Sequence, residues 1–259
     1  MHSLRHAGSH AQTLSQQRPS LTSLAMCGRI TQKSPPDELR LTIIMGTPDD
    51  PRVEKAKLRD REWTPRYNGA PGQEHWVIRQ NHKTGERSLD RLWWGLIPYW
   101  SKEIGRKPIN AKAETVASLP MFRDAYRLRR CIVPIDNFFE WKAIKGAKAK
   151  QPYAIAVKDG QPFGVAGIWE NWKHPGTGDR IRTFAVITCP ANTLVADIHD
   201  RMPVILPSTA YDRWLACVEP DPRDLLAPLD PDLMAIWPIS TRVNSVTNDD
   251  EDLLVPFNE

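Results

Sequence analysis

Residues 131–141 have the sequence CIVPIDNFFEW, a run of branched and aromatic apolar side chains that predicts a β-strand. Further strand-like runs are separated by turn sequences such as Lys158-Asp159-Gly160, and they lie at 75–79, 87–94, 152–157, 163–169 and 181–188. Strands do not alternate with helices and glycine-rich phosphate loops. The sequence therefore predicts an α+β fold: a single domain on a curved, mostly antiparallel β-sheet or partial barrel with short flanking helices.

The flanking helices are expected at four places: 36–45, 112–118, 120–129 and 208–217. Pro36 would lie in the first turn of the first helix, where proline is well tolerated. Ser208 is the expected N-cap of the last helix, with Trp214 and Leu215 on its inner face. Short strand-like runs at 26–31 and 234–246 complete the expected elements.

The composition is that of an ordinary globular protein. The chain has 259 residues, of which 41% are hydrophobic and 25% charged, and this balance excludes wholesale disorder. No apolar run approaches the roughly 18 residues of a membrane helix, so no membrane partner is expected. The net charge of +4 is too small to indicate a nucleic-acid partner by itself. The cysteines, at 27, 131, 189 and 217, form no CxxC pair, which predicts free thiols in a reducing, cytoplasmic setting without a bound metal or cofactor.

Residues 1–25 differ in composition from the rest of the chain. They contain three histidines, two arginines and no acidic residue, and they lack the apolar segment of a secretory signal. We expect either a disordered extension or a misassigned start codon, with translation truly beginning at Met26. The composition also loosely resembles an organellar transit peptide. The functional domain is accordingly expected at 26–259.

Cys27 directly follows Met26, and a cysteine exposed at a chain start has distinctive chemistry. Its α-amine has a reference pKa of about 7.7–8.0 and can form a Schiff base with an aldehyde. Its thiol, held close by, can then close a five-membered thiazolidine ring. The alternative is an ordinary buried free thiol, the commoner fate of cysteine.

Glu140 is surrounded in sequence by Phe138, Phe139 and Trp141. On a strand, Phe138 and Glu140 would face one side and the other two rings the opposite side. A carboxylate beside large rings is desolvated, which raises its pKa and suits it to general acid–base catalysis. The alternative is an exposed glutamate on an edge strand.

Two further polar side chains are candidates for the same site. His199 lies between Asp197 and Asp200, and such flanking carboxylates can fix its tautomer for proton transfer, although a structural histidine in a salt-bridge cluster is the alternative. Asn110 could bind a substrate oxygen through its amide or simply cap a helix.

Aromatic and basic side chains alternate in two segments of the chain. Tyr99 and Trp100 are followed by cations up to Lys112, and Met121 and Phe122 by a run of arginines. Rings beside cations suit single-stranded nucleic acid, because bases stack on rings while phosphates pair with cations. The alternative is core tryptophans next to solvated lysines.

Taken in order, these motifs resemble one family, the SOS-response-associated peptidase (SRAP) family of abasic-site processing proteins. The resemblance rests on 26–29 (MCGR), 65–71 (PRYNGAP), 94–98 (WGLIP), 109–115 (INAKAET), 139–142 (FEWK), 197–203 (DIHDRMP) and 240–244 (STRVN). Each motif is short, but the ordered set spans nearly all of 26–246.

The resemblance implies a covalent mechanism on single-stranded DNA that contains an abasic site. Cys27 would attack the sugar aldehyde and close a thiazolidine, giving a protein–DNA crosslink. Asn110 would hold the cysteine or the sugar, Glu140 would move protons, and His199 would assist sugar opening and reversal. The resemblance also implies a peptidase activity that exposes the cysteine and a DNA lyase side reaction.

The resemblance also implies which residues bind DNA. Arg29 and Arg66 match positions that contact phosphates, and Asn68 and Thr188 would line the pocket. Lys112 stands where many members carry arginine, so a bidentate phosphate grip would become a point-charge contact. The remaining expected contacts are those that stack on bases, Tyr99, Trp100 and Met121.

Two other functions fit parts of the sequence. A cysteine hydrolase would use Cys27 as the nucleophile and His199 as the base, and it would need no free amine. A non-catalytic module would bind single-stranded nucleic acid through the aromatic and basic segments alone. We favour the abasic-site function, in a monomer that associates with the nucleoid when bound to DNA.

Overall fold

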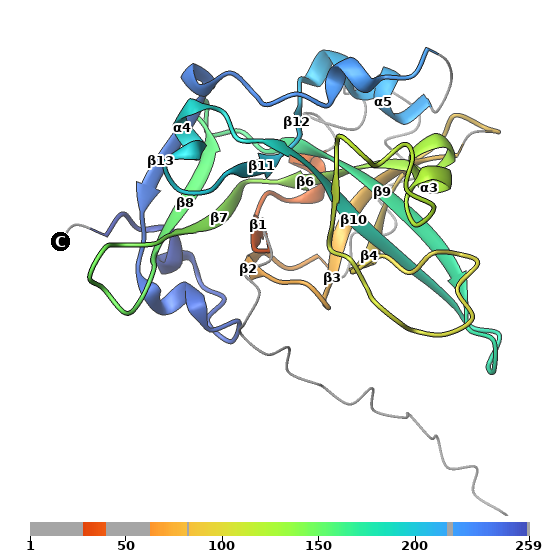
Figure 1. Cartoon of the computed structure of the whole chain (residues 1–259), viewed down its shortest axis with the longest axis horizontal. Helices are drawn as coiled ribbons and strands as arrows, with labels where there is room; N and C mark the ends of the chain where they lie inside the picture. Colours follow the sequence, from red (N-terminus) through yellow and green to blue (C-terminus); the bar gives the residue numbers. More distant parts are fainter. Residues whose placement is uncertain (1–27, 40–62, 82, 217–219, 258–259) are drawn as a thin grey trace, which may run out of the picture.

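Two β-sheets form the framework of the protein. The computed structural model describes residues 28–39, 63–81, 83–216 and 220–257, and all structural statements concern these residues. One sheet has five strands in the order β13-β8-β7-β1-β2. Its strands are β1 (Ile30–Gln32), β2 (Arg66–Gly69), β7 (Asn137–Lys142), β8 (Gln151–Val157) and β13 (Met234–Pro238). Figure 1 shows β7, β8 and β13 together at one end of the molecule.

The second sheet has eight strands and closes partly on itself. Its strands are β3 (Glu74–Gln80), β4 (Arg87–Trp94), β5 (Asn110–Lys112), β6 (Arg130–Ile135), β9 (Phe163–Lys173), β10 (Arg180–Pro190), β11 (Arg201–Pro203) and β12 (Ile205–Leu206). The ring β10-β4-β3-β6-β9 returns to β10, so five of these strands form a barrel. Pairing is antiparallel throughout this sheet except where β10 runs parallel to β4 and β5. The expected mostly antiparallel fold with a partial barrel is confirmed.

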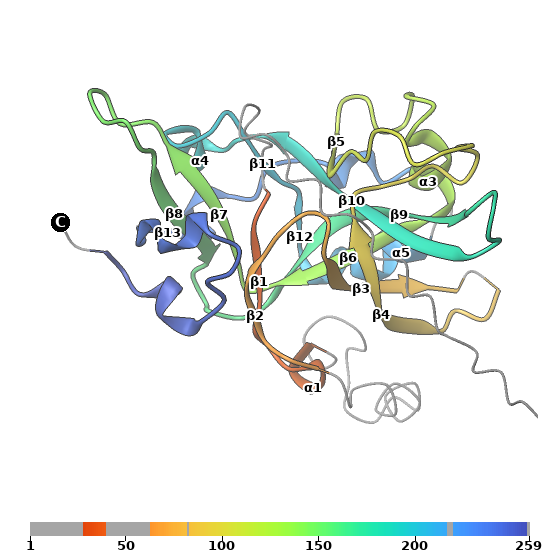
Figure 2. The same ribbon diagram turned by 90° about the horizontal axis from the view of Figure 1, so that it is seen from below.

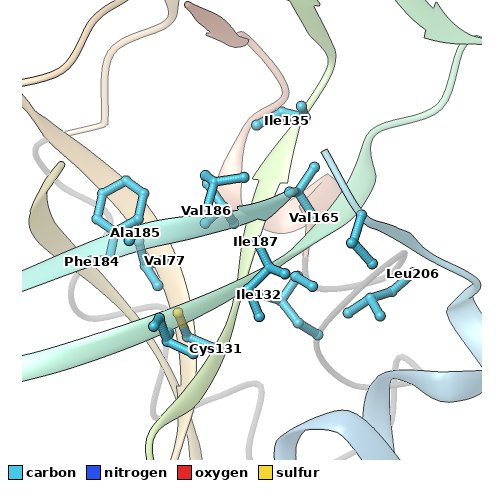
Figure 3. Close-up of a cluster of buried hydrophobic side chains, with 14 of the residues drawn as sticks. Val77, Cys131, Ile132, Ile135, Val165, Phe184, Ala185, Val186, Ile187 and Leu206 are labelled. Carbon is cyan, nitrogen blue, oxygen red and sulfur yellow. The ribbon is translucent and has the colours of Figure 1, made fainter. Parts of the chain in front are cut away.

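Apolar side chains from the barrel strands fill its core. Val77, Ile132 and Val165 are at most 1% exposed, and they meet side chains from β10 and β12 in one buried cluster (Figure 3). Burying a side chain of this size stabilises the fold by roughly 1.5–3 kcal/mol. A second, smaller cluster contains Phe139 and Leu253 and lies under the C-terminal segment.

The run 131–141 forms two strands instead of the single strand predicted, because Asp136 interrupts it. The buried Asp136 carboxylate accepts hydrogen bonds from the backbone N–H groups of Lys33 (2.7 Å) and Ser34 (3.2 Å) and from the Ser34 hydroxyl. These bonds bend the chain, so β6 ends in the barrel and β7 begins in the other sheet. The same chain segment thus links the two sheets.

The helices are shorter than predicted. The helix expected at 112–118 is wrong, since β5 extends to Lys112 and turns follow it, and only α3 (Arg123–Leu128) remains of 120–129. Residues 208–217 form a 3-10 turn, η3 (Ser208–Ala210), and then α5 (Tyr211–Ala216), with Trp214 and Leu215 buried as expected. Pro207, not Ser208, occupies the N-cap position.

The remaining elements are short. Helix α1 (Pro36–Leu39) begins where expected, while residues 40–45 of that prediction and residues 26–27 of the first strand lie outside the described residues. The run 234–246 is strand only in β13 and continues into η6 (Thr241–Asn244). Others are α4 (Thr193–Ala196), η4 (Arg223–Leu225), η5 (Pro231–Leu233) and η7 (Glu251–Leu254). Within the described ranges, every helix is too short or too polar to cross a bilayer.

Candidate active site and nucleic-acid interface

Glu140 is buried on a central strand. It lies on β7 between β1 and β8, and it is only 3% exposed. The predicted alternation holds, because Phe138 belongs to the barrel core whereas Phe139 and Trp141 belong to the smaller cluster. The edge-strand alternative is therefore wrong, and the carboxylate is shielded from bulk water, which disfavours its charged form.

The strand that carries Glu140 is bonded to the chain just after Cys27. The N–H of Phe139 donates to the carbonyl of Arg29 at 3.1 Å, and Ile30 pairs with Phe138. Cys27 itself lies outside the described residues. Its sequence neighbour Gly28 is the first residue described.

Asn110 lies on a strand, so the helix-cap alternative is wrong. β5 pairs in parallel with β10, which sets Asn110 beside Val186 and Lys112 beside Thr188. The Ala113 N–H then donates to the carbonyl of Thr188 at 2.8 Å, which continues the pairing beyond the strand. The side-chain oxygen of Asn110 is buried. Pairing with β10 provides backbone partners that a local helix would otherwise supply.

His199 lies in the loop between α4 and β11. Its Nδ1 accepts a hydrogen bond from the Arg201 N–H at 3.2 Å, and the same atom lies 2.8 Å from an Asp200 carboxylate oxygen. Burial lowers the pKa of His199, as do the nearby charges of Lys150 and Arg201, while Asp200 opposes the shift. The lowered pKa favours the neutral ring near pH 7, which is able to accept a proton, and the carboxylate of Asp200 and the N–H of Arg201 both face Nδ1.

An ion pair that the sequence reasoning missed holds the His199 loop against the end of β5. The guanidinium of Arg201 donates hydrogen bonds to both carboxylate oxygens of Glu114, at 2.6 and 2.8 Å, and to the Thr188 carbonyl at 2.6 Å. Three segments thus meet at one guanidinium. Glu114 and Arg201 both lie in the motifs 109–115 and 197–203. A buried arginine needs hydrogen-bond acceptors, and the fold shows that Glu114 and Thr188 supply them.

This pair predicts an acid-dependent loss of stability. The hydrogen bonds from Arg201 lower the pKa of Glu114 to about 2, from 4.5 in the unfolded chain. The stabilisation is therefore complete above pH 4.5 and is lost as the pH falls towards 2. Because the Glu114 side chain is 48% exposed, we expect about 1 kcal/mol or less. Urea unfolding at several pH values should show a shallower acid loss for Glu114→Gln, and equal slopes for both proteins would contradict this assignment.

The side chain of Asn68 connects four residues through hydrogen bonds. Its amide nitrogen donates to the carbonyls of Val243, Ser245 and Asn248 at 2.8–3.1 Å, and its oxygen accepts from Arg29 at 2.7 Å. Asn68 and Thr188 are both 0% exposed. Both side chains are fully buried, and a direct DNA contact by either stays a prediction.

Arg29 and Arg66 differ in how their charges are compensated. Arg29 donates to Asn68 and to the carbonyls of Val243 and Asn244, all of them uncharged acceptors, and burial lowers its pKa. Arg66 instead forms an ion pair with Asp249 at 3.2 Å. The Arg29 guanidinium lies 5.9 Å from the Trp141 ring centre, on the face of β7 opposite to Glu140, and its charge is not neutralised by any of these acceptors.

The predicted stacking side chains lie on the surface. Tyr99 and Trp100 are each 51% exposed, as expected of side chains that stack on bases. Trp94 is only 1% exposed and belongs to the core, so the alternative of core tryptophans is confirmed for that residue. The Arg129 guanidinium lies 5.3 Å from the Tyr99 ring centre and is held by the buried Glu170 at 2.8 Å. Lys112 is exposed, and Met121 is half-buried against the barrel core.

Glu140, His199 and Asn110 come from three separate elements, β7, the α4–β11 loop and β5. Figure 2 shows the β7–β8 hairpin, α4, β11 and β5 in succession along one edge of the molecule. Among the residues that the structure describes, no group of three or more histidine, cysteine, aspartate or glutamate side chains is arranged to hold a metal ion.

Comparison with known proteins gives a consistent result. The family model of the SOS response associated peptidase (SRAP) matches residues 26–246. Abasic site processing protein YoqW of Bacillus subtilis is 38% identical over 238 residues, covering 88% of this chain and 99% of its own. Abasic site processing protein HMCES of Gallus gallus is 30% identical, covering 90% and 78%. A crystal structure from Bacteroides thetaiotaomicron superposes with a TM-score of 0.75 at 26% identity, covering 90% of this chain and all of that one.

Proposed function

This chain belongs to the SOS response associated peptidase family, and from that premise we propose that it recognises abasic sites in single-stranded DNA and couples to them covalently through Cys27. The observation that carries the proposal is the hydrogen bond between Phe139 and Arg29. It holds the strand that bears the buried Glu140 against the segment directly after Cys27. Arg29 follows Cys27 by two residues, so the Cα atoms of the two can be no more than about 7.6 Å apart.

The proposed reaction has two bond-forming steps. The α-amine of Cys27 adds to the aldehyde of the ring-opened sugar and water leaves, which gives a Schiff base. The thiol then adds to the C=N carbon and its proton passes to the nitrogen, which closes the thiazolidine. Glu140 transfers these protons in a shielded site, and the amide of Asn110 holds the reacting groups. His199, neutral near pH 7, takes up a proton during sugar opening and during reversal.

Binding to the strand is proposed to use cationic side chains and apolar or aromatic side chains that are at least partly exposed. Arg29, Arg66 and Lys112 contact phosphates, while Tyr99, Trp100 and Met121 stack on bases. A single strand is favoured because an abasic site within a duplex must first be distorted or flipped out. The names of the relatives, abasic site processing proteins, support DNA with abasic sites as the partner of a domain at 26–259.

The extension before Cys27 requires a processing step in this proposal. An internal cysteine has no free amine, so residues 1–26 must be absent from the active form. The peptidase named by the family fits removal of this segment by the protein itself, as part of a response to DNA damage.

A trapping experiment tests the covalent step. With protein that begins at residue 27, Cys27→Ser should stop at a Schiff base, because a hydroxyl adds to C=N far less readily than a thiol. Borohydride should therefore fix the serine variant to abasic oligonucleotide, while the cysteine protein should give a heat-stable adduct without reductant. A heat-stable adduct from the serine variant without borohydride would contradict thiazolidine formation.

A further inference from the structure

The hairpin between β7 and β8 carries a cluster of lysines that none of the functions above uses. Its sequence from 142 to 150 is KAIKGAKAK, with lysines at 142, 145, 148 and 150. No aspartate or glutamate occurs between Trp141 and Lys158. Within the described part of the chain, none of these four lysines forms an ion pair. The cluster, here called the lysine hairpin, thus presents uncompensated positive charge.

The lysine hairpin has a defined shape. Lys142 pairs with Gln151 at its base, and the Ala147 N–H donates to the Ile144 carbonyl at 3.1 Å across a turn in which Gly146 has a positive φ of 86°. Lys145 and Lys148 on this turn are exposed. The cations are therefore held out from the sheet on a short ordered arm.

The base of the lysine hairpin adjoins the candidate active site. Lys142 lies two residues beyond Glu140 on the same strand and therefore on the same face, about 7 Å further along. At the other side of the base, the charge of Lys150 contributes to lowering the pKa of His199. The arm therefore begins next to Glu140 on the same strand.

The arm extends away from the surface already proposed to bind DNA. Figure 2 shows the β7–β8 hairpin at one end of the site edge, and β5 with its adjoining loops towards the other, with α4 and β11 between them. Tyr99, Trp100 and Lys112 belong to that other part. A strand whose abasic sugar lies beside Glu140 would therefore continue over the lysine hairpin on one side.

We propose that the lysine hairpin is a second phosphate-binding arm, which holds the DNA backbone on the side of the abasic nucleotide opposite to Tyr99 and Trp100. This inference rests on the proposed function for the placement of the strand. Lysine suits such a role because it contacts phosphate as a mobile point charge without demanding one base sequence. The arm would add affinity and fix the path of the strand without taking part in the chemistry.

The test compares two double variants of the protein that begins at residue 27. Lys145→Gln with Lys148→Gln removes two charges from the arm, and both side chains are exposed. Lys33→Gln with Lys158→Gln removes two exposed charges elsewhere and serves as the matched control. Binding of labelled, undamaged oligothymidylate is measured by fluorescence anisotropy over a range of salt concentrations.

The arm variant should show a weaker salt dependence than the control. Each lost phosphate contact lowers the slope of log affinity against log salt by about 0.7 on a single strand, so two contacts lower it by about 1.4. Between about 50 and 200 mM salt, this corresponds to a roughly sevenfold smaller loss of affinity. Equal slopes and affinities in the two variants would overturn the proposal and leave the lysine hairpin to another partner, such as an acidic protein.

Abasic oligonucleotides truncated on one side of the lesion locate the contact and separate this proposal from the covalent one. Truncation on the side that meets the arm should weaken binding of wild type but have little further effect in the arm variant, while truncation on the other side should affect both equally. Equal effects of both truncations in all proteins would overturn the placement. Failure of every protein to crosslink, with the slope difference intact, would refute only the covalent function.

Discussion

Protein that begins at Cys27 should form a heat-stable adduct with abasic single-stranded DNA, whereas the intact chain of 259 residues should form none. In the intact chain the nitrogen of Cys27 belongs to a peptide bond, and its lone pair is delocalised into the carbonyl. Such a nitrogen cannot form a Schiff base, whatever the state of Glu140 or His199. The expected effect is therefore the complete loss of adduct.

Intact-mass measurement beside a denaturing gel checks this prediction. Each preparation is weighed before and after incubation with abasic oligonucleotide, so that every adduct is assigned to a chain of known start. If the protein removes its own extension, Glu140→Gln and His199→Ala should retain more of it than wild type does. A robust adduct from a chain that still carries residues 1–26 would exclude the amine mechanism and favour chemistry by the thiol alone.

Glu140→Gln should slow crosslinking by about 10²–10⁴-fold in protein that begins at Cys27. The amide has nearly the shape of the carboxylate but can neither take up nor deliver a proton. Glu140 is 3% exposed on a central strand, so water has little access to replace it. The rate is measured under single-turnover conditions with saturating abasic oligonucleotide, so that binding does not limit it.

Two controls separate chemistry from folding in this experiment. Glu86→Gln makes the same change at an exposed position in the β3–β4 turn and should leave the rate unchanged. The affinity of Glu140→Gln for undamaged single-stranded DNA should equal that of wild type, since the proposed phosphate and base contacts lie elsewhere. A rate within threefold of wild type, in a folded variant, would show that Glu140 does not transfer protons.

Part of the candidate site could be predicted from sequence because its signals are local. Alternation along 137–142 predicts that Glu140 shares a face with Phe138, and β7 shows this arrangement. Strand formation at β3, β4, β8, β9 and β10 follows from branched and aromatic runs between turn residues, so these strands were placed to within a few residues. Local pattern also explains the buried Trp214 and Leu215 of α5.

Other features depend on residues that are distant in the sequence. The break at Asp136 exists because its carboxylate binds backbone groups 102 and 103 residues away, and those bonds separate one apolar run into two strands. Asn110 was ambiguous in the sequence, and pairing with β10 made its segment a strand. In both cases a non-local hydrogen-bond partner outweighed a weak local preference.

The sequence by itself determined the chemical groups of this protein: the cysteine at 27, the shielded carboxylate at 140, the histidine at 199 and the rings beside cations. Only the tertiary structure decided how they are held, through the ion pair between Arg201 and Glu114 and the hydrogen bonds of Asn68. The physical reason is that residue type and periodicity are properties of neighbouring positions. Partners for a buried charge or amide are set by the closure of the two sheets, which no local pattern encodes.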